Sequence, residues 1–224
     1  MKLNIYGDSI MKAVTVDEHD KYRPLAKGLL EQLRDTTGIE TVNRAHFGYT
    51  SERGQIVLQK DLEHGIDCQW ALLEFGGNDC DHNWQEVADA PDREHLPHLS
   101  LSRFVDNLRS MIQNLKQAGV QPVLMTLPPL DAQRYLERIG RQGCDTRAIL
   151  RWLGDVQMIY RWQELYSNAV ARLAGELRLP LADIRSRFLS RRDYQSLIAR
   201  DGIHLTPAGY DLVFAELGKT LLTS

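Results

Sequence analysis

Four short segments of this 224-residue chain carry the residue types that acyl transfer requires: a nucleophile, a base, a group that orients the base, and donors for an oxyanion. Ser9 supplies a hydroxyl and His204 supplies a base. Asp201 lies three residues before His204 on a glycine-containing turn, so one loop can bring its carboxylate to the imidazole Nδ1–H. The four segments are Gly7-Asp8-Ser9, Phe47-Gly48, Gly76-Gly77-Asn78-Asp79 and Asp201-Gly202-Ile203-His204.

Three donors for the oxyanion are predicted from the same segments: the backbone N–H groups of Ser9 and Gly48, and the side-chain amide of Asn78. A glycine at position 48 lets the backbone approach a substrate closely. Taken singly, each segment is also typical of an ordinary turn. Asp8 is expected to hold the Ser9 loop by accepting hydrogen bonds from backbone N–H groups. Only the combination of the four segments favours catalysis over turn structure.

Strands that alternate with helices must position these segments. Strands are predicted at residues 3–6, 39–44, 70–75, 120–127 and 180–184, and helices at 21–35, 50–63, 102–118, 157–178 and from 206 onward. Tyr22 is expected on the apolar face of the first helix, and Thr206 as the N-cap of the last, before Pro207. The alternation predicts one three-layer α/β/α domain over residues 1–224, with a parallel sheet covered on both faces. The carboxyl ends of its strands then gather the four segments at one rim.

Two polar stretches interrupt the alternation, each directly after a strand. Residues 80–100 follow the third strand, and residues 131–156, which are rich in arginine, follow the fourth. The second stretch is predicted to form one or two short helices over the sheet edge. Both stretches are expected to build the rim of the substrate pocket.

The overall composition limits the class of protein. With 43% apolar and 25% charged residues the chain is long enough for one sizeable core, and its net charge of −3 argues against nucleic acid or an anionic membrane as partner. A local group of basic residues is interleaved with Asp183 and Asp193 and is expected to form a solvated helical face. These basic residues are Arg185, Arg187, Arg191 and Arg192.

Cysteine usage and hydropathy indicate the compartment. The three cysteines are odd in number and form no close pair, which argues against a disulfide framework or a zinc knuckle and favours a reducing compartment. No stretch approaches the ~20 apolar residues of a membrane helix, and the N-terminus does not resemble a signal peptide. The protein is therefore expected to be cytoplasmic and not inserted in a membrane.

Other chemistries are less well supported. The histidines at 82, 95 and 98 lie near Asp79 and Asp81, but their spacing is poor for a metal site and favours polar side chains exposed at the surface. Cys80 has no neighbour in sequence that would lower its pKa. The chain has neither a Gly-x-Ser-x-Gly elbow nor a nucleotide-binding glycine motif. No metal and no cofactor are expected.

The four segments, in this order, resemble the conserved blocks of the GDSL-like or SGNH hydrolases, a family of esterases, lipases and deacetylases. Ile10 stands where the family name has leucine, which preserves an apolar side chain. The resemblance implies a flavodoxin-like five-stranded sheet, a triad of Ser9, His204 and Asp201, and an oxyanion hole formed by Ser9, Gly48 and Asn78.

The sequence therefore predicts a metal-independent serine esterase that acts on small-molecule carboxylic esters, with a short acyl group on a polar alcohol. Residues expected to contact substrate are Phe47, Tyr49, Asp79 and Trp84. Two alternatives stay open: a lysophospholipase or thioesterase of the same family, and a non-catalytic module that binds carbohydrate or another ligand. The oligomeric state is not predicted.

Overall fold

Five parallel strands form the central sheet of the protein. A computed structural model describes residues 1–223, apart from the side chains of residues 26 and 27. The strands lie in the order β4-β1-β5-β6-β7. Their bounds are β1 Lys2–Gly7, β4 Glu40–Asn43, β5 Trp70–Glu74, β6 Gln121–Met125 and β7 Leu181–Ala182. The order reverses between β1 and β5, and open α/β sheets bind their ligands at such a reversal.

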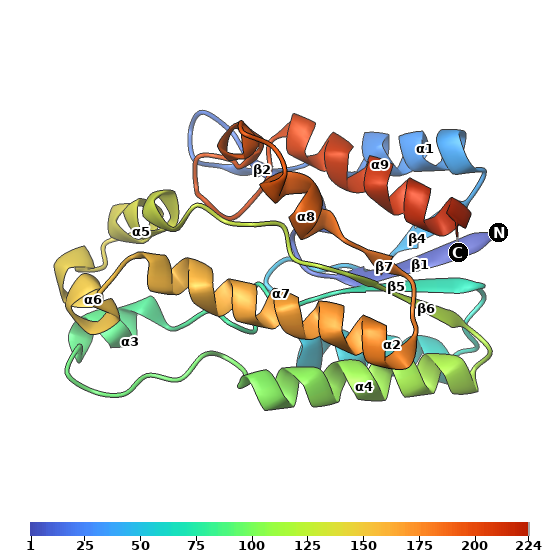
Figure 1. Ribbon diagram of the computed structural model, residues 1–224, viewed down its shortest axis with the longest axis horizontal. Helices are drawn as coiled ribbons and strands as arrows, with labels where there is room; N and C mark the ends of the chain where they lie inside the picture. Colours follow the sequence, from blue (N-terminus) through green and yellow to red (C-terminus); the bar gives the residue numbers. More distant parts are fainter. Residues whose placement is uncertain (224) are drawn as a thin grey trace.

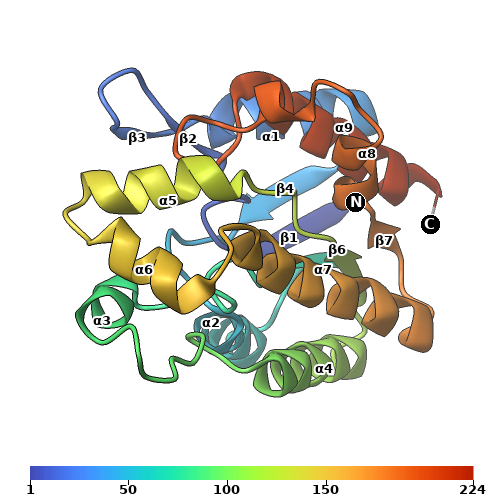
Figure 2. The same cartoon turned by 60° about the vertical axis from the view of Figure 1, so that its left-hand side comes forward.

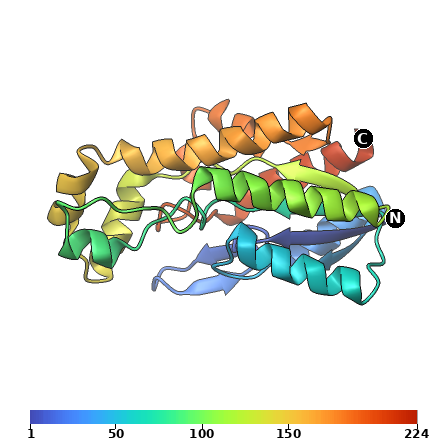
Figure 3. The same ribbon diagram turned by 90° about the horizontal axis from the view of Figure 1, so that it is seen from below.

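Helices cover both faces of the sheet, as the alternation predicts (Figures 1 and 3). One face carries α1 (Ala26–Thr37), α8 (Ile184–Leu189) and α9 (Pro207–Thr223), and the other carries α2 (Ser51–Glu63), α4 (Leu101–Gln117) and α7 (Gln157–Leu177). The three-layer, flavodoxin-like architecture is thus confirmed.

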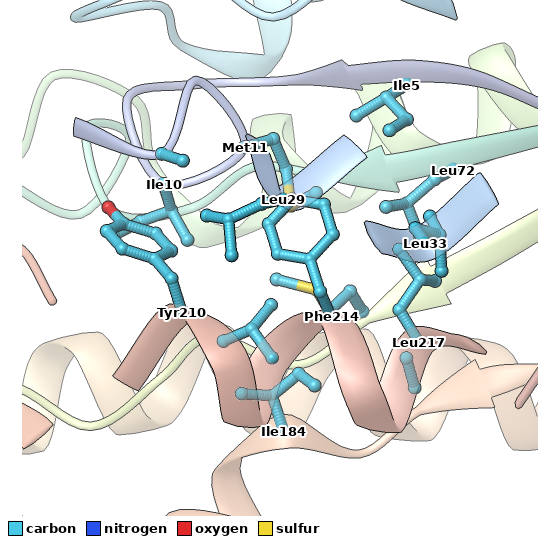
Figure 4. Packing of buried hydrophobic residues seen from close by; sticks show 14 of the residues in the cluster. Ile5, Ile10, Met11, Leu29, Leu33, Leu72, Ile184, Tyr210, Phe214 and Leu217 are labelled. Atoms are coloured by element: carbon cyan, nitrogen blue, oxygen red, sulfur yellow. The ribbon is translucent and has the colours of Figure 1, made fainter. Parts of the chain in front are cut away.

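Alternate residues of each strand enter different apolar clusters. Ile5 and Leu72 face α9, where they pack with Phe214 and Leu217 (Figure 4), whereas Tyr6 joins the cluster beneath α2, α4 and α7. This alternation follows from the two-residue period of a strand. Because both faces of the sheet are buried, the register of the strands is fixed, and with it the position of the strand ends that carry the site.

A third apolar cluster lies beyond the carboxyl ends of the strands (Figure 2). It is formed by α3 (Trp84–Asp89), α5 (Ala132–Arg141), α6 (Thr146–Leu153) and the start of α7. The second polar stretch therefore forms two helices, in agreement with the prediction of one or two. Helix α3 in the first stretch was not predicted, since only Trp84 and Val87 of that helix are buried.

One predicted element is wrong at its start. The helix expected over residues 21–35 begins at residue 26, because Tyr22–Pro24 is strand β3 of an antiparallel hairpin with β2, Val14–Val16. Pro24 disfavours a helical conformation of the residue before it. Tyr22 is consequently not on a helix face but 39% exposed. The strand predicted at 180–184 is also shorter, because Ile184 already begins α8.

Helix ends agree better with the sequence. Thr206 caps α9 by accepting a hydrogen bond from the Gly209 N–H, at 3.3 Å. A short 3₁₀ helix, Tyr194–Leu197, precedes this region and was not predicted. Within residues 1–223 no helix is both long and apolar enough to cross a membrane.

Candidate active site

Ser9, His204 and Asp201 form one continuous hydrogen-bonded chain. Ser9 follows β1, and its Oγ lies 2.8 Å from Nε2 of His204. Nδ1 of the same imidazole lies 2.6 Å from Oδ2 of Asp201. All three side chains are buried, so bulk water does not compete for these bonds. The arrangement can move a proton from the serine to the histidine while the carboxylate fixes the ring.

Asp201 is held as an anion. Burial alone raises the pKa of this carboxyl, but hydrogen bonds from the His204 ring and from backbone N–H groups outweigh burial, so the pKa lies below its usual value. Those N–H groups belong to Ile203 and His204, at 3.2 and 3.1 Å from Oδ1. An ionised Asp201 favours the proton on Nδ1 and leaves Nε2 free to accept.

Gly202 gives this loop its shape. Its φ of +83° is in the left-handed region, and a Cβ added there would lie 2.5 Å from the Asp131 carbonyl oxygen and from the Tyr135 N–H nitrogen. The carbonyl oxygen of Gly202 in turn accepts a hydrogen bond from the Asp131 N–H at 2.8 Å. The start of α5 is therefore packed directly against the loop that carries Asp201 and His204.

Asp8 links the nucleophile loop to the loop after β5. Its Oδ1 accepts a hydrogen bond from the Ile10 N–H at 2.8 Å, which confirms the predicted backbone tether. Its Oδ2 accepts from Nδ2 of Asn78 at 2.9 Å. The Asn78 amide also donates to the Tyr49 carbonyl oxygen at 3.2 Å. Both amide hydrogens thus have acceptors, and an oxyanion would have to share one of them.

Glu74, the last residue of β5, was missed by the sequence analysis. It pairs in register with Gly7 and lines the cavity beside Ser9. Its carboxyl group is buried next to Asp8. Burial and the neighbouring Asp8 carboxylate hold the pKa of Glu74 well above its usual value. The raised pKa favours the protonated, uncharged form of the Glu74 carboxyl group.

The signal for Glu74 was present in the sequence. It is the one charged residue in an otherwise apolar strand, Trp70-Ala-Leu-Leu-Glu74. Both faces of a central parallel strand are buried, so a carboxyl group there must be neutral or paired.

Gly48 has a φ of +72°, which explains the need for glycine at this turn. Within the described chain, neither its N–H nor that of Ser9 has an acceptor. Gly48 does not belong to the cavity wall, whereas Ser9 and Asn78 do. The structure therefore brings two of the three predicted donors directly to the cavity and places the third outside its wall.

The four residues expected to contact substrate have different positions. Trp84 lines the cavity, and Phe47 lies over the His204 ring, 51% exposed. Asp79 and Tyr49 do not line the cavity. Asp79 instead accepts hydrogen bonds from the N–H and hydroxyl of Ser51 at the start of α2, and burial raises its pKa to about 6.

The cavity leads from Ser9 and His204 into the third apolar cluster and has a volume of about 70 Å³. Its inner wall is mostly aromatic and includes Trp84, Tyr135 and Trp162. Asp81 ties this wall together, since it accepts hydrogen bonds from Nε1 of Trp84 at 2.9 Å and from the Tyr135 hydroxyl at 2.5 Å. The polar stretch 80–100 therefore contributes buried walls as well as surface.

Three expectations about polar residues require correction or extension. His82 is buried among Trp84, Trp152 and Trp162, not on the surface, and burial lowers its pKa to about 4. Arg185 is 5% exposed: it donates to Gln163 and lies over Tyr160, so it is not part of a solvated face. Burial raises the pKa of the Cys80 thiol well above its usual value, which makes it a poor nucleophile. In the described part of the chain, no three His, Cys, Asp or Glu side chains are placed to hold a metal ion.

The sequence model of the GDSL-like lipase/acylhydrolase family matches residues 5–212. The chain belongs to this family. The match includes Ser9, His204 and every residue between them. Membership makes the protein a hydrolase of the GDSL type.

Several curated members of the family are similar over most of the chain. The isoamyl acetate-hydrolyzing esterase of Saccharomyces cerevisiae is 25% identical over 99% of this chain and 86% of its own length. The human isoamyl acetate-hydrolyzing esterase 1 homolog is 26% identical over 80% of this chain, and the matched part is 66% of that protein. An Arabidopsis thaliana GDSL esterase/lipase is 29% identical over 80% of this chain and 71% of its own.

Solved structures of the family share the fold. A lipase/acylhydrolase from Enterococcus faecalis superimposes with a TM-score of 0.69 over 98% of this chain and 94% of its own, at 20% identity. An acetylxylan esterase from Geobacillus stearothermophilus gives 0.64 over 98% and 93%, also at 20% identity. At this identity the likeness concerns the arrangement of strands and helices alone.

Proposed function

We propose that this protein is a serine esterase that hydrolyses carboxylic esters through an acyl-enzyme on Ser9. The observation that carries the proposal is the buried series of hydrogen bonds from Ser9 Oγ through His204 to an ionised Asp201. As Ser9 attacks the acyl carbon, Nε2 of His204 takes its proton, and Asp201 stabilises the imidazolium. Collapse of the tetrahedral intermediate breaks the bond to the alcohol oxygen, which receives that proton from His204.

Water completes the cycle. It attacks the acyl carbon of acyl-Ser9 with His204 again as the base, and the acid is released as Ser9 regains its proton. The protein's own residues supply every proton transfer in this sequence.

The oxyanion is stabilised by donors from Ser9 and Asn78 in the cavity wall and from Gly48 outside it. Two backbone N–H groups without acceptors, those of Ser9 and Gly48, support this role. Asn78 contributes by sharing an amide hydrogen that in the free protein is donated to Asp8 or Tyr49. Donors that are already in place cost no reorganisation when charge develops, which is what makes such sites effective.

The acyl group is short, from acetyl to butyryl. The small cavity and its tightly bonded inner wall support this, because Asp81 joins Trp84 and Tyr135 into one network that a long chain would have to disrupt. The names of the yeast and Geobacillus proteins, which refer to acetate and acetyl esters, point the same way.

The polar alcohol predicted from sequence has less support. That prediction depended on charged residues in the two polar stretches, and many of these are already paired. Arg134 donates to the Ile198 carbonyl oxygen, Arg151 bonds to Asp92, and Arg141 lies 3.6 Å from Asp20. The preference for one kind of alcohol therefore depends on the side chains next to His204.

Two measurements test the proposed function. A fluorophosphonate should label Ser9 and no other hydroxyl of the folded protein, as peptide mapping will show. Absence of labelling would favour the non-catalytic ligand-binding module.

In a series of p-nitrophenyl esters from C2 to C16 below the micellar concentration, kcat/KM should peak by C4. A value still rising past C8 would move the protein to the lysophospholipase or thioesterase alternative.

A further inference from the structure

Two exposed aromatic rings cover the buried His204. Its imidazole and the Tyr22 ring make a T-shaped contact with a centroid distance of 5.1 Å and an interplanar angle of 65°. The Phe47 ring is stacked on the imidazole at 6.0 Å and 18°. Tyr22 and Phe47 also contact each other, at 5.0 Å. His204 is 2% exposed, whereas Tyr22 is 39% and Phe47 is 51% exposed. The rings thus present an apolar surface to solvent directly beside the base.

The two rings come from segments that are far apart in the chain. Tyr22 lies on β3 of the hairpin, which projects beside α5 (Figure 2), and Phe47 lies on the loop between β4 and α2. Neither ring belongs to the wall of the cavity that leads to Trp84. They therefore form a second surface beside His204, outside the wall of the aromatic cavity.

The chemistry of ester cleavage indicates which surface faces the alcohol and which faces the acyl group. In the step that breaks the ester, His204 Nε2 must donate its proton to the alcohol oxygen, so that oxygen lies within hydrogen-bonding reach of the imidazole. The first carbons of the alcohol then lie next to His204, against its aromatic cover. The acyl group, whose carbonyl oxygen faces the donors of Ser9 and Asn78, points into the cavity.

The surroundings of the aromatic pair determine the kind of alcohol. The Arg138 guanidinium lies over the Tyr22 ring at 5.5 Å, and Asp20 of the hairpin pairs with Arg141 and Arg200. The charged groups of Arg138, Arg141, Arg200 and Asp20 thus contact other groups of the protein. What remains for a substrate is the exposed area of two rings, which favours alkyl or aryl groups over hydroxylated ones.

We infer that Tyr22 and Phe47 form the site for the alcohol portion of the ester, and that this site takes an apolar alkyl or aryl alcohol. This inference depends on the proposed function, since it requires an acyl-enzyme on Ser9 and proton donation by His204. It assigns the short acyl group and the alcohol to different surfaces of the same active site.

The test uses esters that share one acyl group. Methyl, butyl and benzyl acetate and an acetylated sugar all give the same acetyl-Ser9, so deacylation is identical and differences in kcat/KM report the alcohol. Tyr22→Ala and Phe47→Ala should each lower kcat/KM for benzyl acetate by about tenfold, because each buried CH₂ equivalent is worth roughly fourfold. For methyl acetate, which is too small to reach both rings, the loss should be less than about twofold by the same estimate.

Control variants separate binding from structure. Tyr22→Phe, which keeps the ring, should keep the benzyl-to-methyl selectivity that Tyr22→Ala loses. Leu96→Ala removes an apolar side chain that is 76% exposed and should leave every rate unchanged. Thermal unfolding of each variant verifies that it is folded.

Two outcomes would overturn the inference. Equal losses for methyl and benzyl acetate would mean that the rings support His204 and do not bind the alcohol. A preference for the sugar acetate that survives both substitutions would show a polar alcohol site elsewhere. Failure of the proposed function would be distinct, because the parent protein would then hydrolyse none of these esters and Ser9 would not react with a fluorophosphonate.

Discussion

At the scale of single residues, the site depends on polar groups that hold one another in place before any substrate binds. Asp8 accepts from both the Ile10 N–H and the Asn78 amide, and burial beside Asp8 raises the pKa of Glu74. Sequence motifs predicted Ser9, Asn78, Asp201 and His204 as site residues, and the structure brings them close together. The motifs did not identify Glu74, whose role depends on a neighbour across β1 and β5 and not on a nearby residue in the chain.

The amide of Asn78 gives the first prediction. Asn78→Ala should lower kcat by about 10²–10³ with little change in KM, because one donor to the transition state is lost while substrate binding is kept. Steady-state kinetics on p-nitrophenyl acetate measure both constants. A parent-like kcat would mean that the amide serves only to join Asp8 to Tyr49.

The carboxyl of Glu74 gives a prediction about stability and pH. Its pKa is raised in the folded state, so above about pH 4.5, its value in the unfolded chain, the folded protein binds more protons than the unfolded one. The contribution of Glu74 to the free energy of unfolding must therefore fall as pH rises from about 4.5 toward its raised pKa in the folded protein. The Glu74→Gln variant has no ionisable carboxyl group at this position, so its stability relative to the parent should increase from pH 5 to pH 9.

Urea unfolding at the two pH values measures this difference. The exposed Glu63→Gln is a matched control and should show no such trend. A Glu74→Gln variant that loses stability relative to the parent at high pH would indicate an ionised Glu74 with a positive partner.

At the scale of elements, long periodic helices and apolar strands were predicted well, and short elements were not. The β2–β3 hairpin has strands of three residues each, too short to show a two-residue period, and its fold depends on distant contacts such as that of Tyr22 with Phe47. Helix α3 was hidden in a polar stretch for the same reason. His82 looked like a surface residue because the tryptophans at 152 and 162 that bury it lie about 70 residues away or more.

The loop between Asp201 and His204 gives a prediction at this scale. Gly202→Ala adds a Cβ that would clash with the backbone of Asp131 and Tyr135, so the loop must move and take His204 with it. We expect kcat to fall by at least tenfold, a change that roughly 1.4 kcal/mol of lost transition-state stabilisation produces.

Gly119→Ala is the matched control. Gly119 has a similar φ of +74° but no atom within 4 Å of its Cβ position. It should show only the backbone cost of about 1–2 kcal/mol in stability, with kcat unchanged. Equal kinetic effects of the two substitutions would contradict the proposed packing of the loop on α5.

At the scale of the whole molecule, we propose that the 224 residues form one domain in which the polar stretches are part of the core structure. Helix α7 supports this, because it packs in the second apolar cluster through Tyr166 and Val170 and in the third through Ile159. The cytoplasmic location and the reducing compartment stay predictions from sequence.

Cooperative unfolding tests the single domain. Three of the four tryptophans, at positions 84, 152 and 162, belong to the third cluster, so their fluorescence reports that region, whereas far-UV circular dichroism reports all helices. The two signals should change at the same urea concentration. Ile149→Ala, at a fully buried position of the third cluster, should shift both together by about 2–5 kcal/mol of stability. Separate transitions would show that the cluster unfolds on its own.

The hairpin that carries Tyr22 is attached to the rest of the site by ion pairs. Asp20 lies 3.3 Å from Arg200 and 3.6 Å from Arg141, and these arginines are 48% and 38% exposed. Arg200 immediately precedes Asp201 and also donates to the Glu18 carbonyl oxygen. Dissolved ions weaken attractions between partly exposed charges, with a screening length of about 10 Å at 0.1 M and about 3 Å at 1 M. Raising ionic strength should therefore loosen the hairpin while the buried Ser9, His204 and Asp201 stay in place, and the choice between large and small leaving groups should become a function of the salt in the buffer.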